Sequence, residues 1–163
     1  MTLNRRHLML STGALALASC SSQDADASEA QYANSPVRRI TDAQWRARLP
    51  AASYQTLRHE ATERPGTSPL NNEHRRGTFV CKGCDLPLFR SEWKFDSGTG
   101  WPSFYEVIGA NVGTKTDNLI GFPRTEYHCA RCLGHQGHLF NDGPRPTGKR
   151  YCNNGVALSF RPA

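Results

Sequence analysis

The 163-residue chain lacks an apolar run long enough to cross a bilayer, since a spanning helix needs about 20 apolar residues. It has no dense run of Lys and Arg and, apart from two similar cysteine pairs, no internal repeat. The formal net charge is +6, and it falls to +4 if a leader carrying Arg5 and Arg6 is removed, because residues 1–19 contain no acid. This mild, scattered charge favours solubility over binding of nucleic acid. The length suggests one domain.

The N-terminus has the pattern of a bacterial secretion signal. Arg5 and Arg6 precede the apolar run Ala14 to Ala18, which gives the signal a twin-arginine character. The run ends in Leu17-Ala18-Ser19-Cys20, which resembles a lipoprotein cleavage box and implies lipidation of Cys20. An ordinary signal peptide cut nearby is the alternative. We therefore expect a signal peptide over 1–19, a flexible tether over 20–39, and an exported lipoprotein on the periplasmic side of a bacterial membrane, anchored at Cys20.

Four of the six cysteines form two close pairs, Cys81-Lys-Gly-Cys84 and Cys129-Ala-Arg-Cys132. Two such pairs separated by a long insert have the spacing of a tetrahedral zinc site. Four thiolates without a spare ligand predict one structural Zn²⁺ per chain rather than a catalytic ion. Disulfides are the alternative in an oxidising compartment, although a twin-arginine route exports proteins that have already folded around metal.

The patterns predict a mainly β fold class, a small antiparallel domain over residues 40–163 with short helices near its N-terminus. Thr41 and Asp42 favour the start of one helix, and a second follows Pro50 over residues 51–60. Residues 61–76 read as an ordered loop. The expected strands are 77–81, 87–90, 101–107, 119–122, 125–129 and 151–160.

Cys152 is the cysteine without an evident structural role. On an extended strand Arg150, Cys152 and Asn154 share a face, because alternate side chains point the same way. Arg150 can lower the pKa of the thiol, and Asn154 can orient a partner through its amide. Cys152 is therefore a candidate nucleophile. The alternative is a buried structural cysteine.

A segment rich in histidine precedes this strand. If it is extended, His138, Phe140 and Asp142 share a face, and Asp142 can fix the tautomer of an imidazole. His138 can give or take a proton near neutral pH. The alternative is a catalytic zinc bound by His135, His138 and Asp142.

A third segment, residues 95–104, combines glycines with aromatic side chains. Glycines on both sides of Thr99 let the backbone approach a ligand, and Trp101 and Phe104 can form the walls of an apolar pocket. The alternative is that Trp101 belongs to the core.

Taken together, these motifs closely resemble those of the B-type peptide-methionine sulfoxide reductases over residues 41–160. The matching segments are Ser97-Gly-Thr-Gly-Trp-Pro-Ser-Phe104, Arg124-Thr-Glu126, Gly137-His-Leu-Phe140, Asp142-Gly-Pro144, Pro146-Thr-Gly148 and Arg150-Tyr-Cys-Asn-Asn154. The resemblance implies reduction of the R epimer of methionine sulfoxide in proteins and peptides, and a fold of two antiparallel sheets. It also implies a structural zinc held by Cys81, Cys84, Cys129 and Cys132.

The resemblance also assigns roles to the site. It implies that the Cys152 thiolate attacks the sulfoxide sulfur, that His138 protonates the oxygen, and that Trp101 and Phe140 receive the methyl group. The resulting sulfenic acid is reduced by a partner, a thioredoxin-like or other thiol. The surrounding network comprises His135, Asp142, Arg150 and Asn154.

The chain departs from the family pattern at two positions. Thr99 stands where many members carry a second, resolving cysteine, so we expect an external thiol to reduce Cys152 directly. Gln136 stands where Leu is usual, and we expect it to affect local packing or hydrogen bonding. Two rival functions remain, a non-catalytic zinc-ribbon binding module and a thiol–disulfide oxidoreductase that uses the Cys-x-x-Cys pairs.

Overall fold

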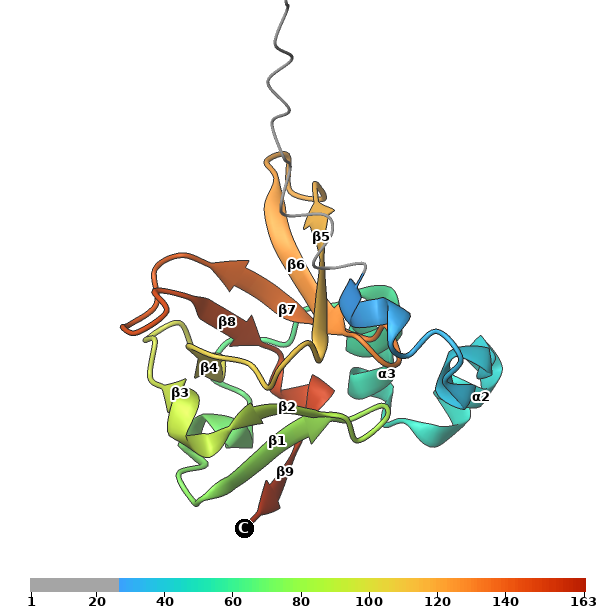
Figure 1. The fold of residues 1–163 in the computed structure, drawn as a ribbon, viewed down its shortest axis with the longest axis horizontal. Helices are drawn as coiled ribbons and strands as arrows, with labels where there is room; N and C mark the ends of the chain where they lie inside the picture. Colours follow the sequence, from blue (N-terminus) through green and yellow to red (C-terminus); the bar gives the residue numbers. More distant parts are fainter. Residues whose placement is uncertain (1–26) are drawn as a thin grey trace, which may run out of the picture.

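A computed structural model describes residues 27–163, so the expected signal peptide and Cys20 lie outside the described residues. Two antiparallel sheets form the domain, one of three strands in the order β2-β1-β9 and one of six in the order β3-β4-β8-β7-β6-β5 (Figure 1). The expected fold class, mainly β with two antiparallel sheets and few short helices, is confirmed. Among the described residues, no helix is both long and apolar enough to cross a membrane.

The strands are short and lie mostly in the second half of the chain. Their bounds are β1 Gly77–Cys81, β2 Pro87–Arg90, β3 Lys94–Phe95, β4 Ser103–Phe104, β5 Val112–Asp117, β6 Arg124–Cys129, β7 His135–Phe140, β8 Arg150–Asn153 and β9 Leu158–Pro162. Residues 27–30 are helical, and two further helices follow, α2 Asp42–Arg48 and α3 Ala51–His59. The 3-10 turns are η1 Pro36–Arg39, η2 Pro69–Asn72, η3 Ser91–Trp93 and η4 Gly155–Ala157.

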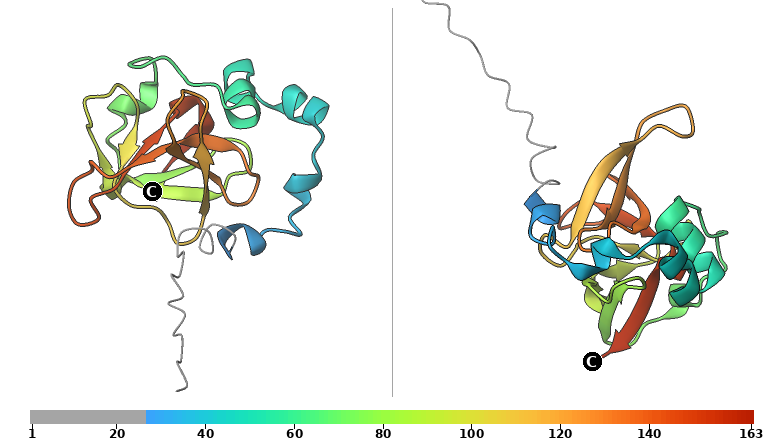
Figure 2. Two further views of the ribbon diagram at one scale, coloured as in Figure 1. Left: turned by 90° about the horizontal axis from the view of Figure 1, so that it is seen from above. Right: turned by 90° about the vertical axis from the view of Figure 1, so that its right-hand side faces the viewer.

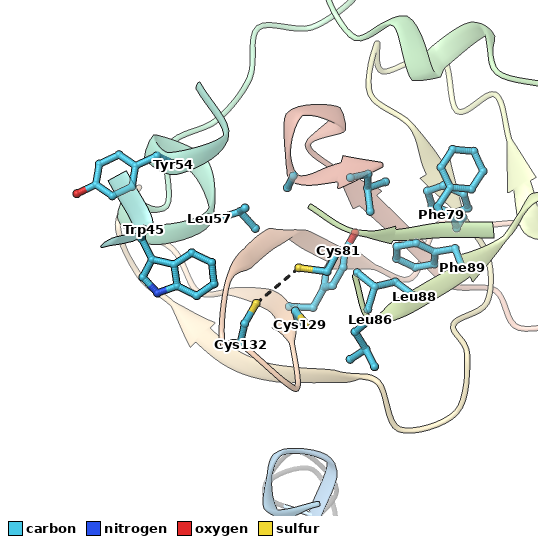
Figure 3. Packing of buried hydrophobic residues seen from close by; sticks show 14 residues of the cluster. Trp45, Tyr54, Leu57, Phe79, Cys81, Leu86, Leu88, Phe89, Cys129 and Cys132 are labelled. Carbon is cyan, nitrogen blue, oxygen red and sulfur yellow. Dashed lines mark hydrogen bonds between the residues drawn. The ribbon is translucent and has the colours of Figure 1, made fainter. Parts of the chain in front are cut away.

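Helices α2 and α3 begin where the sequence predicts. The Thr41 side chain accepts from the Gln44 amide while the Gln44 side chain accepts from the Thr41 amide, which is a capping box. Trp45 and Leu57 are the large apolar residues that these helices bury beside the cysteines (Figure 3). The helices therefore cover the end of the domain that holds the cysteine cluster.

Aromatic residues fill the core between the sheets. Phe89 stacks on Phe104 with ring centroids 4.1 Å apart, and Phe79 meets Phe104 edge-on at 4.9 Å. Phe79, Phe89, Phe104 and Tyr127 are all fully buried. Phe79 and Phe89 come from the three-stranded sheet, and Phe104 and Tyr127 come from the six-stranded sheet, so their contacts join the two sheets. Burial of each such side chain contributes about 1.5–3 kcal/mol of hydrophobic stabilisation.

Three expected strands differ from those observed. The single strand expected over 151–160 is two strands in different sheets, β8 and β9, with the 3-10 turn η4 between them. Residues 119–122 are not a strand but the turn of the β5–β6 hairpin, which projects from the body of the domain (Figure 2). Of the segment 101–107, only Ser103–Phe104 is paired.

Residues 27–39, the described part of the expected tether, lie beside the second cysteine pair. The Arg38 guanidinium donates to the carbonyl of Ala130 at 2.8 Å, and the Tyr32 hydroxyl donates to Asn111 at 2.9 Å. The His128 ring lies 2.8 Å from the Glu29 carboxylate. These contacts attach residues 27–39 to the loops and strands around Cys129 and Cys132.

Candidate functional site

The four paired cysteines meet in one cluster. Their sulfur atoms all lie within 4.8 Å of one another. Cys81 Sγ is 3.6 Å from Cys132 Sγ (Figure 3), and Cys84 Sγ is 3.5 Å from Cys129 Sγ. A disulfide would need about 2.05 Å. Tetrahedral zinc with Zn–S bonds of about 2.3 Å places its sulfurs roughly 3.8 Å apart. The separations therefore fit four ligands around one metal ion.

Both cysteine pairs lie in the same kind of turn. The Asp85 amide donates to the Cys81 carbonyl and the Leu133 amide donates to the Cys129 carbonyl, each at 2.8 Å. Asp85 and Leu133 each adopt a left-handed conformation with φ of 60°. The first turn follows β1 and the second follows β6, so a metal ion here would link the two sheets.

The chemistry of the four donors also fits a divalent cation. Hydrogen bonding to Cys129 and the other cluster thiols, together with burial, holds the pKa of the Cys81 thiol well above its ordinary value. Four clustered sulfurs, three of them buried and that of Cys84 partly buried, cannot all ionise without a positive charge between them, and a metal ion supplies that charge. Within residues 27–163 these four cysteines are the one group of three or more His, Cys, Asp or Glu side chains whose ligand atoms lie close enough together to bind a metal ion. The alternative zinc site at His135, His138 and Asp142 is therefore not formed.

Cys152 lies at the centre of the larger sheet. It pairs with His138 of β7 on one side and with Ser103 of β4 on the other. A pocket of about 120 Å³ opens there. The expected residues that line it are Trp101, His138, Phe140, Cys152 and Asn154, joined by Thr62, Arg124, Gly137 and Asn153.

A register shift between β6 and β7 brings the two histidines to one face. His135 pairs with His128 and His138 pairs with Glu126, although residues three apart on a regular strand point to opposite faces. The two rings are 5.6 Å apart. His135 is buried with its Nδ1 3.0 Å from Glu126 Oε1, and it does not line the pocket. It therefore lies behind His138.

The carboxylate that contacts His138 is Asp117, so the prediction that Asp142 orients this ring is wrong. His138 Nε2 is 2.7 Å from Asp117 Oδ2, which also accepts from Arg124 at 2.5 Å. A hydrogen bond from the Leu119 amide, then those from His138 and Arg124, hold the pKa of Asp117 below its usual range. Because Asp117 stays ionised and can only accept, the imidazole proton of neutral His138 lies on Nε2, and Nδ1 is left as an acceptor.

Burial governs the charge of both reacting side chains. It lowers the pKa of His138, although the Asp117 hydrogen bond acts in the opposite direction. It raises the pKa of the Cys152 thiol, and the Arg150 charge and the Thr99 hydroxyl only partly offset that effect. Arg150 lowers the pKa of the Cys152 thiol, as predicted, but the opposite effect of burial is larger. The resting site therefore holds a neutral thiol and a neutral imidazole.

Asp142 and Arg150 form a pair at the edge of the site. Both carboxylate oxygens of Asp142 accept from the Arg150 guanidinium at 2.8 Å. The Arg150 guanidinium also lies over the Phe140 ring, 4.2 Å from its centroid. Asp142 therefore holds Arg150, and Arg150 in turn supports Phe140 and reaches Cys152.

A chain of hydroxyl groups lies on the other side of Cys152. Thr99 Oγ1 is 4.0 Å from Cys152 Sγ, and Ser97 Oγ lies 2.8 Å from both Thr99 Oγ1 and Ser103 Oγ. The position where the family pattern often has a resolving cysteine is thus beside Cys152 and holds a hydroxyl.

The loop after α3 fixes the remaining walls of the pocket through Glu63. The Trp101 indole N–H donates to the Glu63 carbonyl at 2.8 Å, and the Glu63 amide donates to Asn154 Oδ1 at 2.9 Å. Because β8 ends at Asn153, Asn154 is not on the strand face expected for it. Its buried side-chain amide forms hydrogen bonds to the main chain instead, and its Nδ2 donates to the Gln136 carbonyl at 3.0 Å.

The sequence patterns do not single out Asp117 or Glu63, and they include Ser97 only as part of a motif, without a role. The one signal for Asp117 was a carboxylate seven positions before Arg124, in a segment whose strand was not expected.

Comparison with known proteins gives a consistent result. The family model of the SelR domain matches residues 49–162. The "Peptide methionine sulfoxide reductase MsrB" of Thiobacillus denitrificans is 53% identical over 123 residues, which cover 75% of this chain and 93% of that protein. The protein of the same name from Pseudomonas putida is 53% identical over 120 residues, 73% of this chain and 90% of its own. "Peptide methionine sulfoxide reductase B1, chloroplastic" of Arabidopsis thaliana is 45% identical over 156 residues, 95% of this chain and 76% of its own.

Proposed function

Because the chain belongs to the SelR domain family of peptide methionine sulfoxide reductases, we propose that it reduces the R epimer of methionine sulfoxide in proteins and peptides to methionine. The observation that carries the proposal is the pairing of Cys152 with His138 across β7 and β8, in a pocket walled by Trp101 and Phe140. A nucleophile and a proton carrier then face one small, partly apolar space.

The protonation states support a route for the proton. Cys152 begins as a thiol and His138 Nδ1 as an acceptor, so the thiol proton passes to His138 as the sulfur attacks. In the same step His138 gives a proton to the sulfoxide oxygen, which makes the substrate sulfur electrophilic enough to be attacked. A transient bond joins the two sulfurs, and it breaks together with the S–O bond as the oxygen passes to Cys152. The products are methionine and the sulfenic acid of Cys152.

The aromatic walls position the substrate. The methyl group of the sulfoxide packs against Trp101 and Phe140, and the oxygen turns toward His138. Trp101 is held by its bond to the Glu63 carbonyl, and Phe140 is covered by the Arg150 guanidinium. A rigid apolar wall opposite a proton donor distinguishes two epimers, because only one places its methyl group and oxygen correctly at once.

An external thiol regenerates the enzyme. Attack on the sulfenic acid releases water and gives a mixed disulfide, and a second thiol then frees Cys152 as a disulfide forms in the reductant. Within residues 27–163 every other cysteine belongs to the metal-binding quartet, and Thr99 has no sulfur. A thioredoxin-like dithiol suits this step. Trapping a disulfide between Cys152 and another cysteine of the same chain would refute it.

The quartet Cys81, Cys84, Cys129 and Cys132 would hold a structural zinc ion. When bound, that ion supplies folding energy by linking the two sheets, and it takes no part in the reaction.

The chain is also proposed to be exported and lipidated at Cys20. The twin arginines and the Leu17-Ala18-Ser19-Cys20 box support this, and mass spectrometry of the mature N-terminus tests it. An unmodified N-terminus elsewhere would refute the lipid anchor.

The deciding experiment compares wild type with Cys152→Ser, both produced from Ser21 onward. Each is given a dithiol reductant and either the R or the S epimer of a methionine sulfoxide peptide, and the methionine formed is quantified. Turnover of the R epimer alone, lost in Cys152→Ser with its metal content unchanged, is expected. No turnover by a folded, metal-loaded wild type would favour the zinc-ribbon binding module. A quartet without stoichiometric metal would favour the thiol–disulfide oxidoreductase.

A further inference from the structure

Gln136 is a fully buried polar residue beside the cysteine quartet. Its side-chain Nε2 lies 3.4 Å from Cys81 Sγ, a hydrogen-bond length for a sulfur acceptor. A weaker contact of 3.5 Å joins the same nitrogen to the Gly134 carbonyl. The side-chain oxygen Oε1 is buried and accepts no hydrogen bond from any described residue. The amide is therefore satisfied only on the side that faces the metal ligand.

The orientation of this amide follows from its neighbours. Turning it over would place Oε1 against the Cys81 sulfur and the Gly134 carbonyl, which are both acceptors. The observed arrangement avoids that contact between acceptors, and in it the N–H points at sulfur.

The main chain of Gln136 cannot move away from this position. Its carbonyl accepts from both the backbone amide of Asn154 at 2.8 Å and the side-chain amide of Asn154 at 3.0 Å. The next residue, Gly137, is packed so closely on the Cys152 carbonyl that there is no room for a side chain. The strand is thus fixed from the β8 side, and the Gln136 side chain is directed at the quartet.

A packing role alone would favour a different residue. Leu has a similar size and would fill this fully buried space without leaving a polar oxygen unsatisfied. What the amide adds is a donor for the sulfur. A hydrogen bond to a metal-bound thiolate stabilises its negative charge, which opposes its protonation, and it holds the sulfur in the position that the metal requires.

We propose that Gln136 is a positioning residue of the metal centre. Its side-chain N–H donates to the Cys81 thiolate and thereby increases the affinity of the quartet for its metal ion. The inference concerns the quartet and does not depend on the proposed reaction. It assigns a chemical role to the residue at which this chain departs from the usual leucine.

The test measures metal binding in wild type and Gln136→Leu. Competition with a chromophoric chelator should show that Zn²⁺ is held about tenfold to 100-fold more weakly by the variant, the usual effect of losing a hydrogen bond to a ligand. In the Co²⁺-loaded protein the sulfur-to-metal charge-transfer band should move to lower energy, because a sulfur without its hydrogen bond releases an electron more easily.

A matched control separates this effect from loss of packing. Leu57 lies beside both cysteine turns, with its methyl carbons next to Gly83 and Gly134, and it donates no hydrogen bond through its side chain. Leu57→Ala should weaken metal binding through poorer packing but leave the charge-transfer band in place. If Gln136→Leu does not fold, Gln136→Met offers similar length without a donor and should give the same shift.

Two results would overturn the inference. One is a donor-free variant that folds and retains both the wild-type affinity and the wild-type band. The other is a wild-type protein whose quartet binds neither Zn²⁺ nor Co²⁺.

Discussion

Replacing Asp117 with Asn should disable His138 while leaving the pocket in place. Both oxygens of Asp117 are acceptors, Oδ2 from His138 and Arg124 and Oδ1 from the Leu119 amide at 2.8 Å. An asparagine has one acceptor oxygen, so its NH₂ must face a donor on one side. If the NH₂ faces His138, the ring must accept at Nε2, and its proton moves to Nδ1. His138 can then no longer take a proton from Cys152.

The other orientation of the introduced side-chain amide keeps the tautomer but sets its NH₂ against the Leu119 amide, which costs about 1–3 kcal/mol for an unsatisfied buried donor. The substitution also removes the negative charge that raises the pKa of His138, so that pKa falls further. General acid–base catalysis contributes about 10²- to 10⁴-fold. We therefore expect kcat/KM to fall by about that factor, roughly 3–5 kcal/mol of transition-state stabilisation.

The assay is kcat/KM for the R-sulfoxide peptide as a function of pH, with imidazole ¹⁵N NMR to identify the protonated nitrogen of His138. The acid limb of the profile should move to lower pH and the plateau should drop. Asp85→Asn is the matched control, since Asp85 is exposed and pairs with Arg161 at 2.9 Å. A folded Asp117→Asn protein with activity within about threefold of wild type would refute the assigned proton route, because the loss expected from general acid–base catalysis is larger.

Further predictions concern the thiol, the metal and pH. Arg150→Ala should raise the pKa of the Cys152 thiol still further, because Arg150 is the largest influence that lowers it, and the pH dependence of alkylation by iodoacetamide measures this. A downward shift would contradict the electrostatics. Cys129→Ser should abolish stoichiometric metal binding and lower Tm by roughly 10 °C or more in a thermal melt, whereas an unchanged Tm would show that the quartet is not structural. Thr99→Cys should form a disulfide with Cys152 after one turnover, since Thr99 Oγ1 already lies 4.0 Å from Cys152 Sγ, and intact mass after oxidation should show the loss of two hydrogens. Burial lowers the folded-state pKa of His138, so the unfolded chain binds the extra proton first and the free energy of unfolding should fall as pH drops below about 6.5. Urea unfolding at pH values of about 7.5 and about 5.5 measures this loss of unfolding free energy, which should be smaller in His138→Gln than in wild type. An equal loss in the two proteins would assign the effect to other groups.

Local sequence determined the features whose partners lie close along the chain. The capping residues Thr41 and Gln44 are three positions apart and fix the start of α2. Each cysteine pair forms its own turn, so its spacing alone indicated a metal ligand pair. Cys152 was identified by elimination, because the other cysteines already had structural explanations.

Strand pairing decided the rest. Asp117 lies 21 positions from His138 and reaches it only because β5, β6 and β7 pair in one register, so Asp142, which is nearer in sequence, was assigned the wrong partner. The shift opposite His128 moved His135 and His138 to one face, against the simple alternation of a strand. Hydrogen-bond partners in a sheet are set by which strands meet and at which residue. That choice depends on burying the aromatic core as a whole, which no local pattern specifies.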